Sequence, residues 1–299
     1  MAKSILEDIR DNMRSADALY RLIYVNIGVY IVILITNSFS KLFTGANEDI
    51  VISLAGKWLA VPANPHILIT RPWTVITYMF LHFDFFHILF NLLWLYWMGT
   101  ILREFLGSKK VFSTYILGGI SGAILYIILF NLSPFFSNAV ASSYALGASA
   151  AVLAITAAAA TLVPNYSVRL ILIGTVPLKY IALATIALDF VNVSSSNAGG
   201  HIAHIGGAAF GFLYIIQLQK GNDMAGWFNK LMDRLTFSSS GRSTMKVKYR
   251  RAVSDEDYVA SKKSQQERVD EILDKISKSG YGSLTQEEKD ILFKSSKES

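Results

Sequence analysis

The sequence predicts an all-α membrane protein: a bundle of six membrane-spanning helices with a long outer first loop and a short cytoplasmic helical tail. Hydrophobic residues make up 52% of the 299 positions and charged residues only 17%, whereas a soluble domain usually carries about 25% charged residues. The charged residues gather in residues 1–21 and 220–299, and the region between them is nearly free of charge. That region divides into apolar runs of about 20 residues, the length that crosses a bilayer. The polar N-terminal residues lack the features of a cleavable signal peptide, so we expect none.

Six segments fit the requirements of a span. The second begins after Asp84, whose carboxylate is a good helix N-cap. Before the fifth span, Gly174 and Pro177 interrupt a long apolar stretch, so we expect residues 164–177 to form an inner loop along the membrane. The six predicted spans cover about residues 20–38, 84–103, 111–132, 143–163, 178–193 and 200–219.

The basic residues predict the orientation of these spans. Short loops on the cytoplasmic side of a membrane carry an excess of Lys and Arg. Of the 28 Lys and Arg side chains, only Lys41, Lys57 and Arg71 lie in the connections before the second, fourth and sixth spans. We therefore expect these connections to face outward and both termini to be cytoplasmic, in a plasma or inner membrane.

Composition shifts divide the chain further. The outer first loop, about residues 39–83, is long and aromatic, which favours a partly interfacial position over disorder. After the last span, GWFNKLMDRLTF carries apolar side chains on one helical face, as interfacial helices do. In the tail, Gly280 ends one short amphipathic helix, and Thr285 with Glu288 forms a capping box for another. We expect a cytoplasmic N-terminal segment at 1–19, a six-span core at 20–220, an interfacial helix at 221–240, a linker at 241–265 and a small helical tail at 266–299.

Polar side chains on three of the predicted spans lie at a similar depth. Ser149 is about five residues, or roughly 8 Å, below the outer end of the fourth span, and His204 is roughly 6 Å below that of the sixth. His87 and Asn91 occupy the first two turns of the second span and share one face, because four residues separate them. Buried polar groups in a membrane are costly and are usually paired or functional. We therefore expect these four side chains to form one cluster.

Such a cluster has the components of an activated nucleophile. An imidazole can take the proton of a serine hydroxyl and return it to a leaving amine. Backbone N–H groups and His or Asn side chains can stabilise the oxyanion that forms. Small residues let two membrane helices approach closely. They surround both positions: Gly147, Ala148, Ala150 and Ala151 near the serine, and Ala203, Gly206, Gly207, Ala208 and Gly211 near the histidine.

Each of these residues also has a purely structural interpretation. Ser149 can serve packing in an alanine-rich helix, His204 can be a hydrogen-bonded core residue, and Asn91 can hold two helices together. Asp189, near the outer end of the fifth span, can orient an imidazole as a third member of the site or can be a polar helix-end residue. The five histidines show no HExxH-type pattern, no intramembrane carboxylate cluster supports them and the chain has no cysteine, so we expect no metal and no cofactor.

Three motifs resemble those of the rhomboid family of intramembrane serine proteases. HILFN in the second span resembles HxxxN, GAS in the fourth resembles GxS and AHIGG in the sixth resembles AHxGG, within a resemblance that covers about residues 20–220. The resemblance implies that Ser149 is the nucleophile and His204 the general base and acid. It also implies that His87, Asn91 and the backbone N–H of Ser149 hold the oxyanion, and that Gly147 allows close backbone approach. A water-filled cavity open to the outside, with lateral substrate entry near the second and fifth spans, is implied as well.

The chain departs from the family pattern at two positions. Ala150 follows the serine where the family often has glycine, and Leu153 replaces an aromatic residue against which the imidazole stacks in some members. His201 lies almost a turn nearer the outer end of its helix than His204 and lacks the AHxGG context. These departures concern the oxyanion pocket and the orientation of the base.

The sequence thus favours an intramembrane serine endopeptidase that cuts transmembrane segments near their outer end through a Ser–His dyad. Its expected partners are single-span or multi-span membrane protein substrates and the lipid bilayer, with no nucleic acid, and its oligomeric state is not assigned. The alternative is a catalytically inactive relative that binds membrane proteins as a scaffold. A transporter or channel would be expected to show internal repeats or charged residues along a path, and the sequence has neither.

Overall fold

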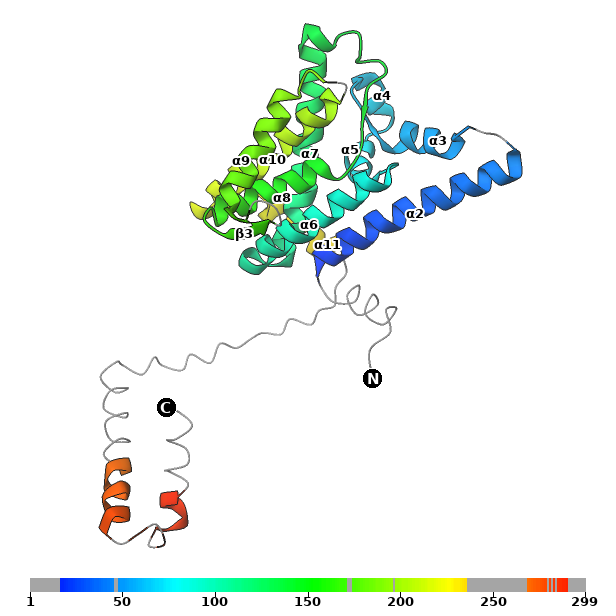
Figure 1. The fold of residues 1–299 in the computed structure, drawn as a ribbon. Coiled ribbons are helices and arrows are strands. Elements are labelled where there is room, and N and C mark those ends of the chain that lie inside the picture. Colours follow the sequence, from blue (N-terminus) through cyan, green and yellow to red (C-terminus); the bar gives the residue numbers. More distant parts are fainter. Residues whose placement is uncertain are drawn as a thin grey trace. The chain divides into compact units, whose positions relative to one another are not determined.

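The computed structural model describes residues 17–45, 48–170, 174–195, 197–235, 268–278, 280, 282 and 284–289. The chain forms two compact units, Met1–Ser238 and Ser239–Ser299. The first unit is mostly helical (Figure 1), and it contains the helices that are long and apolar enough to cross a membrane among the residues that the structure describes.

A helix lies at each of the six predicted spans. Among the described residues, four helices are long and apolar enough to cross a membrane: α2 (Ala18–Thr44), α6 (Phe85–Leu106), α7 (Ser108–Leu132) and α10 (Ala198–Gln219). The other two, α8 (Ser149–Leu162) and α9 (Leu178–Val191), have 14 residues each. At about 1.5 Å per residue they are shorter than the roughly 30 Å of a bilayer core. That α8 and α9 also act as spans stays a prediction.

Side-chain caps set the beginnings of two long helices. The carboxylate of Asp84 accepts a hydrogen bond from the backbone N–H of His87 at 2.8 Å, as the sequence predicts for the start of α6. Asp17 caps α2 in the same manner through the N–H of Leu19, and it also pairs with Arg103 near the end of α6. These caps satisfy N–H groups that have no partner within the helix.

The connection between α2 and α6, which the sequence predicts to face outward, folds into short elements. It contains α3 (Ile50–Leu59), β1 (Val61–Pro62), α4 (Pro65–Thr70), α5 (Thr74–Thr77) and the 3-10 helix η1 (Tyr78–Phe80). The rings of Trp58 and Trp73 stack with centroids 6.3 Å apart, and the guanidinium of Arg71 lies 4.4 Å from the ring centre of Trp58.

The all-α prediction is wrong at two places, because the fold includes two short antiparallel strand pairs. Strand β1 pairs with β2 (Tyr144–Ala145), and β3 (Ser167–Leu170) pairs with β4 (Gly174–Pro177). The second pair occupies the segment predicted to be an inner loop. Prolines at both of its ends and the positive φ of Gly174, 89°, oppose a helix there. The β-branched Val168 and Val176 face each other across the ladder instead.

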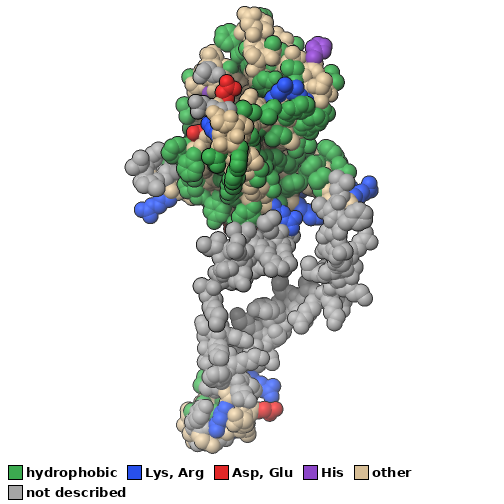
Figure 2. Space-filling model, turned by 90° about the vertical axis from the view of Figure 1, so that its right-hand side faces the viewer, with side chains coloured by type: hydrophobic (Ala, Val, Ile, Leu, Met, Phe, Trp, Pro, Cys, Tyr) green, Lys and Arg blue, Asp and Glu red, His purple; other side chains and the backbone are tan. Residues whose placement is uncertain are grey.

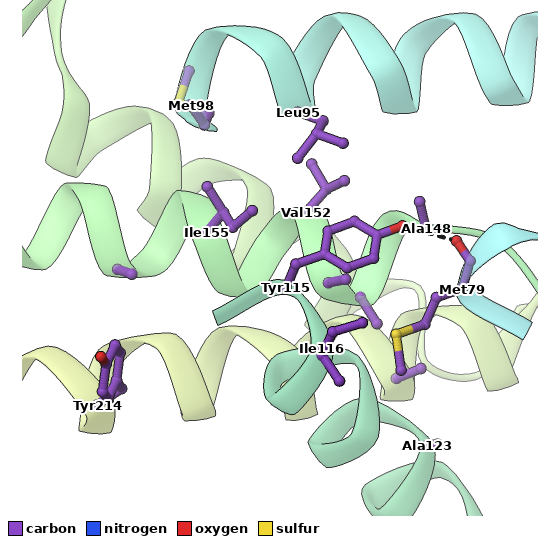
Figure 3. Packing of buried hydrophobic residues seen from close by; sticks show 14 of the residues in the cluster. Met79, Leu95, Met98, Tyr115, Ile116, Ala123, Ala148, Val152, Ile155 and Tyr214 are labelled. Carbon is purple, nitrogen blue, oxygen red and sulfur yellow. Dashed lines mark hydrogen bonds between the residues drawn. The ribbon is translucent and has the colours of Figure 1, made fainter. Parts of the chain in front are cut away.

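Helix α8 lies at the centre of the first unit. It contacts α6, α7, α9 and α10, and most of its alanines are buried. Figure 3 shows α8 between α6 and α10, with Val152 of α8 facing Leu95 of α6. Tyr115 of α7 donates a hydrogen bond to the backbone carbonyl of Met79, which links the core to the connection between α2 and α6.

The outside of the first unit is strongly hydrophobic. Hydrophobic side chains dominate the face of this unit seen in Figure 2. Exposed aromatic and aliphatic residues lie on every long helix, a surface that suits lipid rather than water. On α6 and α9 they include Phe86, Phe90, Trp97, Leu183, Leu188 and Phe190.

The helix predicted to be interfacial is present as α11 (Gly226–Leu235). Phe228 is buried and stacks on Phe112 of α7 with centroids 6.0 Å apart, while Trp227 is exposed. The predicted linker lies outside the described residues. In the second unit, residues 268–278 are helical, and the capping box forms through the contacts of the Thr285 N–H with the Glu288 carboxylate and of the Glu288 N–H with the Thr285 hydroxyl.

Candidate active site

Ser149 is the first residue of α8, not a residue five positions inside a helix. The predicted start of the fourth helix near residue 143 is wrong because residues 143–148 are not helical: Tyr144–Ala145 is a strand, and Gly147 has φ +113°. An L-residue rarely adopts that backbone angle, so the glycine permits the turn that starts the helix. The serine therefore stands at a helix N-terminus, where backbone N–H groups have no partner within the helix and favour negative charge.

The predicted meeting of Ser149 and His204 is present in the structure. The hydroxyl oxygen of Ser149 lies 2.6 Å from Nε2 of His204. Helix α10 begins at Ala198, two residues before the predicted start, so His204 lies deeper in the helix than expected. The contact is possible because α8 and α10 approach through small residues on both sides.

The other imidazole nitrogen of His204 is also engaged. Its Nδ1 lies 2.8 Å from Oδ1 of Asp189 on α9, and Nδ1 of His201 lies 2.8 Å from the same oxygen. Asp189 is therefore bonded to two imidazoles rather than serving only as a polar helix-end residue. The sequence raises this role but cannot distinguish it from the alternative, because the packing of α9 on α10 decides it.

His87 and Asn91 lie on one face of α6, as their spacing predicts. A Cβ placed on Gly147 would lie 2.8 Å from the His87 ring, so the glycine leaves room for that imidazole. The amide nitrogen of Asn91 donates to the carbonyl of His87 at 2.8 Å. This bond stays within α6, so it does not hold two helices together.

A cavity of about 530 Å³ joins these groups. Four helices, α6, α8, α9 and α10, contribute its walls. Its polar lining collects the predicted cluster in one place, and its apolar lining is aromatic and aliphatic. The polar residues are Asp84, His87, Asn91, Ser149, Thr185, Asp189 and His204, and the apolar ones are Phe86, Phe90, Trp94, Val152, Leu153 and Leu188.

His82 is a neighbour of the site that the sequence does not identify. Its Nε2 accepts a hydrogen bond from the backbone N–H of Ala148 at 3.2 Å, directly before the serine. Its ring packs edge-on against His87 with centroids 5.0 Å apart. The sequence offers only the cluster HFDFFH as a signal, and that pattern alone does not show which histidine faces the serine.

One premise of the argument against a metal is wrong. Asp189, His201 and His204 place three ligand atoms within 4.8 Å of one another, so a carboxylate does accompany two histidines. In the structure, however, both imidazole nitrogens lie at hydrogen-bond distance from the carboxylate. The serine contact adds a second partner to His204, a nucleophile–base arrangement.

Fold and site together define a mostly helical, multi-pass membrane protein with a serine and a histidine in contact at a cavity. Residues 70–220 match the family model described as "Rhomboid domain". This match covers half of the chain, and the chain belongs to the rhomboid family. Residues 254–298 match a second model, described as a "Family of unknown function (DUF6576)".

Individual relatives match shorter parts of the chain. "RHOMBOID-like protein 12, mitochondrial" from Arabidopsis thaliana is 29% identical over 160 residues, which is 50% of this chain and 48% of that protein. "Rhomboid protease GlpG" from Salmonella newport is 44% identical over 54 residues, which is 18% of this chain and 19% of that protein. The chain thus spans about half the length of the plant relative and a smaller part of GlpG.

Proposed function

We propose that this protein is an intramembrane serine endopeptidase that cleaves transmembrane segments of membrane proteins near the outer face of the membrane. The observation that carries the proposal is the 2.6 Å contact between Ser149 Oγ and His204 Nε2 at the wall of a cavity. Membership of the rhomboid family supports it, since one matched relative bears the name rhomboid protease.

The reaction begins when Ser149 Oγ attacks the carbonyl carbon of the scissile peptide bond. Nε2 of His204 takes the hydroxyl proton, and the carbonyl oxygen becomes an oxyanion. His87, Asn91 and the backbone N–H of Ser149 are the proposed donors to that oxygen. His204 then gives its proton to the leaving nitrogen, the peptide C–N bond breaks and an acyl-enzyme remains.

Water completes the cycle. His204 takes a proton from a water molecule that attacks the acyl carbon, and a second oxyanion forms in the same pocket. Its collapse breaks the bond to Ser149 Oγ, and His204 returns the proton to that oxygen. The reaction uses one water, releases the two halves of the substrate and restores the enzyme, with no cofactor in any step.

The surroundings of the site fit a membrane-protein substrate. Phe86, Phe90 and Leu188 line the cavity and are also exposed on the outside of the helical unit, so an apolar segment can approach from lipid. A helical peptide bond is shielded, so Gly or Pro residues that loosen the substrate helix should favour cleavage. Six spans, cytoplasmic termini and a plasma or inner membrane belong to the same proposal.

The test is cleavage by the purified full chain in liposomes. A fluorescent single-span substrate should be cut by the parent and by neither Ser149→Ala nor His204→Ala. A serine-directed phosphonate should label the parent at Ser149. Cleavage that survives Ser149→Ala would refute the proposed site, and absence of cleavage with co-purification of a membrane protein would favour the inactive scaffold.

A further inference from the structure

A chain of hydrogen-bonding groups runs from α9 to the serine. Oδ1 of Asp189 lies 2.8 Å from Nδ1 of His204, and Nε2 of the same ring lies 2.6 Å from Ser149 Oγ. The Asp189 side chain is only 10% exposed and that of His204 18% exposed. The carboxylate therefore faces the imidazole inside the helical unit rather than open solvent.

This geometry selects one tautomer of His204. An ionised carboxylate only accepts hydrogen bonds, so the proton of a neutral His204 belongs on Nδ1. Nε2 is then left with its lone pair, directed at the serine hydroxyl. A general base needs that state, whereas a ring protonated on Nε2 cannot accept the proton of Ser149.

We propose that Asp189 is a positioning residue that orients His204 and stabilises its protonated form, so that the site works as a Ser149–His204–Asp189 triad. The inference rests on the proposed protease function and extends it by one residue on a third helix. Leu153, one turn after the serine, lines the cavity with an aliphatic side chain and offers no aromatic ring to the imidazole. The His204 ring packs edge-on against His201, with centroids 5.9 Å apart, and the carboxylate fixes its second nitrogen.

His201 provides a matched control for a merely structural role. It lies on the same helix, its Nδ1 is at the same 2.8 Å from Oδ1 of Asp189, and it links α9 to α10 equally well. In the described part of the chain, Ser149 has a hydrogen bond to His204 and none to His201. Loss of His201 removes one of two links between the helices, whereas loss of the carboxylate removes the partner of the base.

The experiment compares Asp189→Asn with His201→Asn in the full chain, reconstituted in liposomes with the fluorescent substrate. In serine proteases with a Ser–His–Asp triad, replacement of the aspartate by asparagine lowers kcat by about 10⁴-fold. We expect a kcat loss of about 10²- to 10⁴-fold in Asp189→Asn. KM should change little, because the carboxylate acts through His204 rather than on the substrate. His201→Asn should keep most of the parent kcat.

The pH profile separates positioning from packing. In Asp189→Asn, the acid limb of kcat/KM should move to lower pH, because the imidazolium of His204 loses its carboxylate partner. The other titratable groups that line the cavity or contact Asp189 are His87 and Asp84 on the α6 side and His201 on α10. They remain in the variant, so the shift reports on Asp189.

A second measurement tests the proposal even if Asp189→Asn fails to fold. Nitrogen NMR of labelled histidine in Ser149→Ala, with His201→Asn as the assignment aid, reports which ring nitrogen of His204 is protonated. Protonation on Nδ1 supports the proposal, and protonation on Nε2 overturns it. An Asp189→Asn protein that keeps the parent kcat and acid limb, while Ser149→Ala and His204→Ala are inactive, also overturns the triad but leaves the protease proposal intact. Cleavage by Ser149→Ala would instead refute the protease proposal itself.

Discussion

Substitution Gly207→Ala tests whether the close approach of α10 to α8 sets the geometry of the site. A Cβ on Gly207 would lie 2.0 Å from the backbone carbonyl oxygen of Ala150, and one on Gly211 would lie 2.0 Å from that of Ala154. Neither obstacle is the end of a flexible side chain. The added methyl must therefore move one helix against the other.

The displacement can be worked out from the contact. A carbon and a carbonyl oxygen in close contact need about 3.3 Å, so the helices must separate by about 1.3 Å along this line. Ala150 follows Ser149 directly, and His204 is one turn before Gly207. If the serine and histidine shift by as much, their 2.6 Å contact grows to about 3.9 Å. That is beyond the hydrogen-bond range.

The consequence should appear in both activity and stability. A misplacement of about 1 Å can cost roughly 10²-fold in rate, so kcat/KM should fall by about 10²-fold or more. Overpacking a tight contact costs about 1–3 kcal/mol of unfolding free energy. The measurements are substrate cleavage in liposomes and thermal unfolding in detergent.

Gly28→Ala is the matched control. A Cβ on Gly28, inside α2, meets nothing within 4 Å, and glycine inside a helix costs about 0.5–1 kcal/mol relative to alanine. This variant should be as active as the parent and slightly more stable. If Gly207→Ala also cleaves substrate at the parent rate, the small residues on α10 do not fix the serine–histidine distance and the reasoning is wrong.

Three further variants test other parts of the fold. Gly147→Ala places a methyl group on a residue with φ +113°, 2.8 Å from the His87 ring. It should lower kcat about 10²-fold in the cleavage assay. An unchanged kcat would show that this turn does not shape the pocket. Tyr78→Phe removes a 2.6 Å hydrogen bond from a buried hydroxyl to a backbone carbonyl of α7. The free energy of unfolding should fall by about 1–3 kcal/mol, measured by thermal unfolding. A melting temperature equal to that of the parent would contradict this prediction. Burial opposes ionisation of Asp223, but the hydrogen bond and charge attraction from Lys110, together with hydrogen bonds from Ala225 and Tyr214, outweigh it, so the pKa of Asp223 lies below its ordinary value. The contribution of this ion pair to the free energy of unfolding is present above the unfolded pKa of about 3.9 and is lost as pH falls through the lower folded value. Asp223→Asn should therefore flatten the decline of melting temperature below about pH 4, and the lost contribution should be less than about 1 kcal/mol. Parallel curves of melting temperature against pH for the parent and the variant would count against the ion pair.

Local sequence patterns predict much of this fold. Apolar runs predict the helices at the six expected spans, and Asp84 marks the start of α6 because a cap depends only on neighbouring residues. The sequence predicts that Ser149 and His204 meet because both lie near the same ends of their predicted spans, and they do meet, although each helix begins at a residue other than the predicted one. Their catalytic roles stay proposals, supported by that contact and by the family.

Two features are not decided by the sequence, for different reasons. The pairing of Asp189 with His204 requires α9 to pack on α10, and no local pattern encodes that packing, so the sequence leaves two roles of Asp189 open. The hairpin of β3 and β4 is local, but it forms where an apolar stretch equally suggests a loop along the membrane. In both places the local sequence allows two conformations or roles.

The start of α8 depends on distant contacts, and these contacts give the connection between α2 and α6 a structural role. Val61 and Pro62 pair with the strand before the serine, and the carbonyl of Tyr78 accepts the N–H of Gly147 at 2.9 Å. His82 accepts the next N–H, that of Ala148, at 3.2 Å. Residues far away in the sequence therefore hold Tyr144–Ala145 as a strand and engage the N–H groups of Gly147 and Ala148, and the helix begins directly after them. The connection between α2 and α6 thus helps to fix where the proposed nucleophile stands, which is a structural reason for its internal order beyond any contact with lipid.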